Sequence, residues 1–133
     1  MERVFISHAN EDRLLAQRVV QGLESSGVDC WIAPRDIPPG SDYADALDDA
    51  ILNSRAVVFL LSAHSAASSS FCRAELEIAR TESKTIVPVR LNQTAITKGL
   101  RIYLSGRQWL DATDDETQWY ESQGVVGFGS TVR

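Results

Sequence analysis

Short apolar runs alternate with amphipathic stretches along this chain of 133 residues. Five runs have the length and composition of strands, and they cover residues 3–7, 28–32, 56–61, 85–89 and, more weakly, 107–110. The third run, Ala-Val-Val-Phe-Leu-Leu, is apolar without a break, which is typical of a strand covered on both faces of its sheet. Pro88 cannot donate an amide hydrogen, so it places the fourth run towards an edge of the sheet.

Helices are predicted between these runs. Residues 10–26 carry apolar side chains at helical spacing, and Gly27 suits the left-handed residue that ends a helix. Ser41 is the predicted N-cap of a second helix, whose buried stripe consists of Tyr43, Ala46, Leu47, Ala50 and Ile51. A third helix is predicted over residues 71–83. The alternation predicts an α/β domain with a flavodoxin-like, doubly wound sheet of five mostly parallel strands.

The length predicts a single domain over residues 1–133, with its core within 3–111. A weak last helix is predicted over 113–123, with Trp119 as its anchor. The tail from Gly124 has no periodicity, and we expect it to be frayed or to lead into a further domain.

Composition narrows the classes of partner. The net charge is −5 and basic residues occur singly, so neither nucleic acid nor an anionic membrane surface is an expected partner. Cys30 and Cys72 fall in apolar patterns and are predicted to be core residues, and the two histidines lie too far apart for a zinc motif. The first residues contain no apolar run long enough for a signal peptide or a membrane span, so we expect a cytoplasmic protein.

Topology predicts where a ligand would bind. Open parallel sheets bind ligands at the carboxyl ends of their strands, where the strand order reverses. In the flavodoxin-like order this crevice lies between the first and third strands. The first strand ends at Ser7-His8, and the third ends at Ser62, ahead of the helix that carries Glu75.

The third predicted helix has an informative charge pattern. Opposite charges alternate along one stripe, which is typical of a solvated face: Arg73, Glu77, Arg80 and Lys84. Cys72, Leu76 and Ala79 form the predicted buried stripe. Glu75 belongs to neither stripe, since it lies on a half-apolar flank near Phe71. The pattern fits equally a boundary glutamate that reaches water and a carboxylate held in the wall of a crevice.

The connection over residues 33–40 contains three prolines and a glycine. It is longer than the usual ~2–6 residues of such connections, and surplus length of this kind often carries binding. We expect it to protrude.

Together these segments resemble Toll/interleukin-receptor (TIR) domains. Val4–His8 with Asn10–Asp12 is similar to the first sequence box of that family, and Trp31–Gly40 is similar to its second box, the BB loop, in the bacterial form. The serines at 62, 65 and 70, followed by an aromatic residue, a cysteine and then Glu75, resemble the loop and third helix. The resemblance covers roughly residues 3 to 111. Phe71 stands where the family commonly has tryptophan, and Trp109 is the nearest candidate for the third box.

The resemblance implies one of two functions. Many animal members only bind other TIR domains, as adaptors. Many bacterial and plant members cleave NAD to nicotinamide and ADP-ribose or a cyclic product, and their glutamate corresponds to Glu75. We therefore expect an NAD glycohydrolase or cyclase that is activated by self-assembly in bacterial defence or signalling, alongside a sensor domain or partner protein. NAD is then the substrate, and neither a cofactor nor a metal is expected.

Under this hypothesis the chemistry needs few groups. Nicotinamide leaves as a neutral molecule without a general acid, so one carboxylate suffices, unlike in a glycosidase with two. Substrate contacts are predicted at Ser7, His8, Asn10, Arg35, Asp36, Tyr43, Ser62 and Phe71. Assembly contacts are predicted at Ile37, Pro38, Pro39 and Gly40.

Two other classes with a related fold or similar residues fit less well. A response-regulator receiver needs acidic residues after the first strand and an aspartate after the third, whereas these ends read Ser-His and Ser-Ala. A serine hydrolase could combine His8 with the serines at 62–70, but the chain has no Gly-x-Ser-x-Gly elbow.

Overall fold

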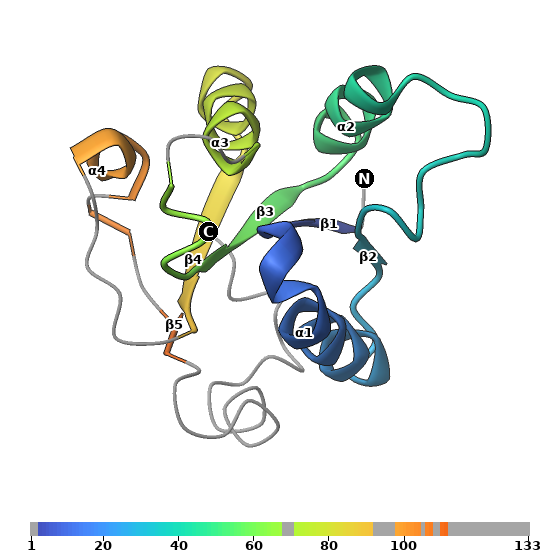
Figure 1. Cartoon of the computed structure of the whole chain (residues 1–133), viewed down its shortest axis with the longest axis horizontal. Helices are drawn as coiled ribbons and strands as arrows, with labels where there is room; N and C mark the ends of the chain where they lie inside the picture. The colour runs from blue at the N-terminus through green and yellow to red at the C-terminus, as the bar shows by residue number, and fades with distance from the viewer. Residues whose placement is uncertain (1–2, 68–70, 92–97, 105, 108–109, 112–133) are drawn as a thin grey trace.

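A computed structural model describes residues 3–67, 71–91, 98–104, 106–107 and 110–111 (Figure 1). Its helices are α1 (Arg13–Ser25), α2 (Tyr43–Leu52), α3 (Cys72–Thr81) and α4 (Lys98–Leu104), with one 3-10 turn, η1 (Asn10–Asp12). Its strands are β1 (Val4–Ser7), β2 (Cys30–Trp31), β3 (Ala56–Leu61), β4 (Thr85–Arg90) and β5 (Leu110–Asp111). The predicted elements at Trp109 and 113–123, the anchor Trp119, Ser70 and the tail from Gly124 lie outside the described residues.

The five strands form one sheet in the order β2-β1-β3-β4-β5, and all four pairings are parallel. This confirms the predicted flavodoxin-like, doubly wound sheet. β3 lies at the centre and all six of its residues are buried, as its unbroken apolar run predicts. β4 is not itself the edge strand, because β5 pairs with it at Val89 and Arg90; Pro88 lies just before that pairing.

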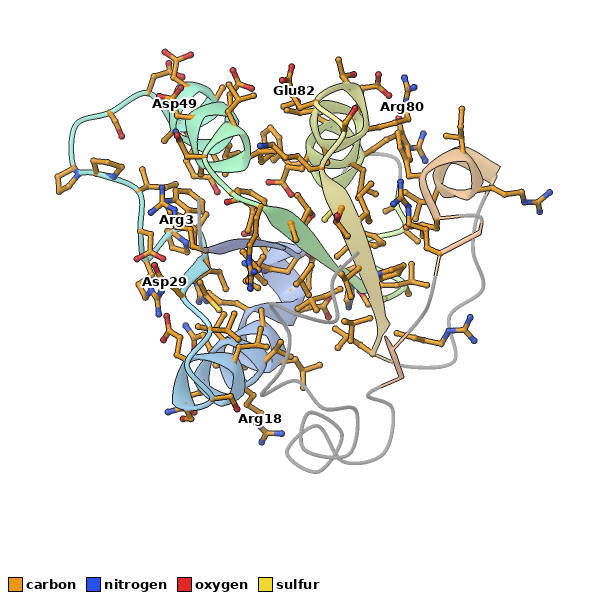
Figure 2. The ribbon with its side chains drawn as sticks, turned by 180° about the vertical axis from the view of Figure 1, so that it is seen from behind. Arg3, Arg18, Asp29, Asp49, Arg80 and Glu82 are labelled. Carbon is orange, nitrogen blue, oxygen red and sulfur yellow. The ribbon has the colours of Figure 1, made fainter. Side chains whose placement is uncertain are left out.

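Helices cover both faces of the sheet (Figure 1). Val4, Ile6 and Val58 face one core together with Val19 and Leu23 of α1. The alternate strand residues face a second core, which α2, α3 and α4 cover; its members include Phe5, Val57, Phe59, Leu47, Leu76 and Leu100. Polar side chains such as Asp49 and Arg80 point away from the sheet on α2 and α3 (Figure 2). Cys30 and Cys72 are buried, as predicted, and burial raises the pKa of the Cys30 thiol to about 12.

Two local predictions about helix starts were wrong in detail. The first helix does not start at Asn10, since the segment 10–12 forms η1 and α1 begins at Arg13. Asp42, not Ser41, caps α2 by accepting a hydrogen bond from the Asp45 amide at 3.0 Å. The Ser41 hydroxyl instead closes the preceding turn by donating to the Pro38 carbonyl at 2.6 Å.

The remaining correction concerns Tyr43, which is 46% exposed although it was predicted in the buried stripe of α2. Tyr43 is the first residue of α2 and precedes the part of that helix that packs on the sheet. Ala46 is half-buried, and the rest of the stripe is buried.

Candidate active site

A cavity of ≈670 Å³ opens at the carboxyl ends of β1 and β3. Its walls come from β1 and the segment after it, from Ala33 beyond β2, and from the start of α2, the loop after β3 and the start of α3. The side chains with polar or aromatic groups in its lining are Phe5, His8, Asn10, Glu11, Tyr43, His64, Phe71 and Glu75. The cavity thus lies at the switch point that topology predicts for a ligand.

Glu75 lies in the wall of this cavity, in the first turn of α3. It is 7% exposed, so it belongs to the buried set of its helix and not to a solvated boundary. Burial raises the pKa of Glu75 to about 7, because a carboxylate loses hydration inside the protein, and the hydrogen bond from Ser7 opposes that rise. The charge pattern leaves open whether Glu75 reaches water at a helix boundary or lies in the wall of a crevice, and its burial in the cavity lining favours the second interpretation.

Ser7, the last residue of β1, lies behind Glu75. Its hydroxyl donates to Oε1 of Glu75 at 2.6 Å, and its side chain is fully buried. Ser7 is absent from the cavity lining among the described residues, so the geometry does not present it for the predicted substrate contact.

Ser62, at the end of β3, likewise turns away from the cavity. Its hydroxyl donates to Asp12 and accepts from the amides of His64 and Ser65 at 3.1 and 3.2 Å. Its hydrogen-bonding capacity is used inside the protein, so we do not retain it as a substrate contact. Sequence reasoning missed Asp12, a buried carboxylate at the end of η1.

His8 and Asn10, two of the predicted substrate contacts, line the cavity. Glu11 and His64 also line it, although neither was predicted from the sequence as a site residue. Nδ1 of His8 lies 2.8 Å from the Ala9 carbonyl oxygen, and Nε2 lies 3.2 Å from the Ala33 carbonyl oxygen. His8 therefore ties the segment after β1 to the residue that follows Ile32. His64 Nδ1 lies 4.0 Å from a Glu11 carboxylate oxygen at the cavity rim.

Two aromatic rings stand at the cavity close to Glu75. Tyr43 and Phe71 have ring centroids 6.1 Å apart at a tilt of 41°, and Phe71 is 66% exposed. Burial, and to a lesser extent the charge of Glu75, raise the pKa of the Tyr43 hydroxyl. The exposed faces of the rings offer a planar ligand an apolar surface.

Arg35 and Asp36 are held outside this cavity. Arg35 pairs with Glu24 of α1 at 2.9 Å and with Asp36 at 2.8 Å, and it donates to the Cys30 carbonyl at 3.0 Å. Asp36 also accepts from the Ile32 amide at 2.9 Å. Arg35 lines a separate hollow beside α1. These contacts use both side chains to brace the base of the loop, so their predicted substrate contact is not retained.

The rest of that loop protrudes beyond the braced base (Figure 1). Pro38, Pro39 and Gly40 are exposed, and Gly40 has a φ of +80°, which favours glycine. Ile37 is half-buried and packs against the core that α2 and α3 cover. The exposed tip is therefore Pro38–Gly40, and Ile37 anchors it.

The family model for the TIR domain matches residues 4–123. The chain belongs to the TIR domain family. The matched segment includes every residue that lines the cavity.

Solved structures share the fold of this TIR domain. The TIR domain of the Toll-related receptor TRR-2 from Hydra magnipapillata is 24% identical, with a TM-score of 0.76 over 93% of this chain and 96% of that chain. The TIR domains of the activated Roq1 resistosome are 26% identical, with a TM-score of 0.59 over 68% of this chain and 57% of that one. The CMP N-glycosidase BcmB of Clostridium botulinum is 14% identical, with a TM-score of 0.65 over 92% of this chain and 98% of that chain. No curated protein matches the chain.

The described residues of the TIR domain contain no group of three or more His, Cys, Asp or Glu side chains placed to hold a metal ion. Nor do they include a helix of the length and apolar character that crossing a membrane requires.

Proposed function

We propose that this TIR domain cleaves NAD at the bond between nicotinamide and ribose, with Glu75 as the catalytic residue. The observation that carries the proposal is a buried carboxylate that opens onto a cavity at the sheet's switch point. A buried acid in a cleft with a perturbed pKa is a frequent mark of a functional site.

The reaction would need only groups that this cavity contains. As the bond from ribose C1′ to the nicotinamide nitrogen breaks, its electron pair stays on that nitrogen and the cationic ring leaves as neutral nicotinamide. Positive charge develops on the ribose, and the ionised carboxylate of Glu75 would stabilise it. Water then adds at C1′ and releases a proton, which yields ADP-ribose; attack by the adenine base instead would yield a cyclic product.

The remaining lining residues supply binding groups. Tyr43 and Phe71 offer exposed ring faces for the nicotinamide, next to Glu75. Asn10 and His64 are the polar side chains available to the ribose and the phosphates, whereas both ring nitrogens of His8 lie against backbone carbonyls. The Roq1 and BcmB structures share the fold of this domain. The first contains the TIR domains of an activated resistosome, and the second is named a CMP N-glycosidase.

Nicotinamide release by the purified chain tests the proposal. Turnover would be measured against protein concentration for the parent and for Glu75→Ala. We expect the parent to gain specific activity as concentration rises, and Glu75→Ala to be inactive throughout. Equal turnover by both proteins would reject Glu75 as the catalytic residue.

A second function has its own observation. The exposed Pro38–Gly40 tip fits a contact between copies of the domain, so we also propose self-assembly through this tip. If the assembled parent releases no nicotinamide, a TIR–TIR interaction module is the function that remains. In either case we propose a role in immune signalling, with a sensor domain or partner protein that supplies the trigger.

A further inference from the structure

We propose that Ser7 is a positioning residue for Glu75: its buried hydroxyl holds one carboxylate oxygen and leaves the other directed at the cavity. The inference rests on the proposed function, because it assigns Ser7 a task in the same site. It also replaces the substrate contact that the sequence predicted for Ser7.

The backbone of β1 fixes the position of the Ser7 hydroxyl. Ser7 pairs with Phe59 in the parallel register of β1 and β3, and its side chain has no exposed surface. A strand residue paired in the centre of a sheet cannot shift without disturbing its neighbours. The hydroxyl is thus a rigid donor, and its 2.6 Å bond to Oε1 restrains the side chain of Glu75.

The bond from Ser7 gives the two carboxylate oxygens of Glu75 different surroundings. Oε1 faces Ser7, which lies behind the cavity wall, while Glu75 itself lines the cavity. In the part of the chain that the structure describes, Ser7 is the one group whose hydrogen bond to this carboxylate is seen. Oε2 is therefore the oxygen left for a substrate. A ribose would meet one oriented acceptor rather than a freely rotating carboxylate.

The surroundings of Glu75 make this donor important for its charge. The titratable groups that face the same cavity are Tyr43 of α2, His8 and Glu11 after β1, and His64 after β3. Of the two influences on Glu75 itself, burial favours the neutral acid and the Ser7 bond favours the carboxylate. A site that needs negative charge thus depends on a bond that opposes the effect of burial.

The pH dependence of NAD turnover by the assembled full chain tests the proposal. Parent, Ser7→Ala and Ser7→Cys would be compared between about pH 5 and 9. We expect Ser7→Ala to lower kcat several-fold at neutral pH, to leave KM within ~2-fold, and to recover towards the parent as pH rises, because the variant lacks the donor that favours the ionised form of Glu75. Ser7→Cys should recover part of the loss, since a thiol is a weaker donor of similar size.

Ser62→Ala is the matched control, because it also removes a buried serine hydroxyl from a carboxylate at a strand end. It should leave the acidic limb of the pH profile at the parent's position. A kcat of Ser7→Ala equal to that of the parent over the whole pH range, or the same limb shift in Ser62→Ala, would overturn the proposal.

A readout without turnover separates this inference from the proposed function. Carbon-13 NMR of labelled glutamate follows the Glu75 carboxyl directly, with Glu75→Gln to assign the signal. We expect Ser7→Ala to raise the pKa of Glu75 above that of the parent, even if no NAD is cleaved. An unmoved titration rejects the positioning role, whereas a shifted titration without nicotinamide release rejects only the NAD cleavage.

Discussion

The hydroxyl of Ser62 donates a hydrogen bond to the carboxylate of Asp12, fifty residues earlier in the chain. Ser7 and Glu75 form the reciprocal pair, since the serine that ends β1 binds a carboxylate that follows β3. The serine that ends β1 and the serine that follows β3 are thus each bound to an acid from the segment after the other strand. The two bonds tie together the segments that build the cavity, but of the two acids only Glu75 lines it.

Ser62→Ala should therefore act on stability. It leaves the buried Asp12 without this donor, and losing a hydrogen bond to a buried charged group costs about 1–3 kcal/mol. We expect a lower midpoint in urea with an unchanged slope, measured by circular dichroism. A midpoint equal to that of the parent would mean that water replaces the hydroxyl.

Glu75→Gln should remove activity. Glutamine keeps the shape and can still accept from Ser7, but it supplies no negative charge to the developing cation. Loss of one such electrostatic contact typically lowers kcat by ~10²–10³. The measurement is nicotinamide release at a protein concentration where the parent is assembled and active.

Glu77→Gln is the internal control for that experiment. Glu77 lies two residues further along α3, where it pairs with Arg80 at 2.7 Å and accepts from the Tyr103 hydroxyl at 2.9 Å. It should change turnover less than ~2-fold, because exposed ion pairs contribute little. Equal losses in both variants would point to damage to α3 and not to catalysis.

Glu75→Gln should also alter the pH dependence of stability. Burial raises the pKa of Glu75 from 4.5 to about 7, so between these values the folded parent holds a proton that the unfolded chain has released. The folded parent therefore loses stability as pH rises through this window. Glutamine does not titrate, so the variant should gain on the parent from pH 4.5 upwards, reaching about 3 kcal/mol above pH 7. Urea unfolding of both proteins at several pH values measures the difference, and a constant difference would contradict it.

Pro39→Asp should separate assembly from folding. The residue is exposed at the loop tip, beyond the base that Arg35 and Asp36 brace, so the monomer should keep its melting temperature. A carboxylate at this place would have to be buried between copies of a domain with a net charge of −5. We expect turnover at high protein concentration to fall and light scattering to show fewer oligomers.

Fusion of Pro39→Asp to an oligomeric scaffold provides the matching rescue. Forced proximity compensates for a weakened contact by raising the effective concentration. Recovery of turnover would support the assembly role of the tip. A variant that assembles and turns over like the parent without the scaffold would exclude the tip from assembly.

Much of the fold could be predicted from the sequence because burial leaves a local periodic record. The unbroken run over 56–61 predicts a central strand, and the alternation of runs and amphipathic stretches predicts the parallel sheet and its switch point. Of the predicted substrate contacts, the structure brings His8, Asn10, Tyr43 and Phe71 to one cavity with Glu75.

Only the tertiary structure decided what the individual polar side chains do. Whether Glu75 is buried depends on α2 and β1 meeting α3, and its partner Ser7 lies 68 positions away in the chain. The positions of Arg35 and Asp36 likewise depend on their partners. Arg35 pairs with Glu24 of α1 and Asp36 accepts from the Ile32 amide, and both side chains lie outside the cavity. A local pattern records how much apolar surface each segment must bury. It does not record which distant donor satisfies a given carboxylate, since that choice is made when the elements pack.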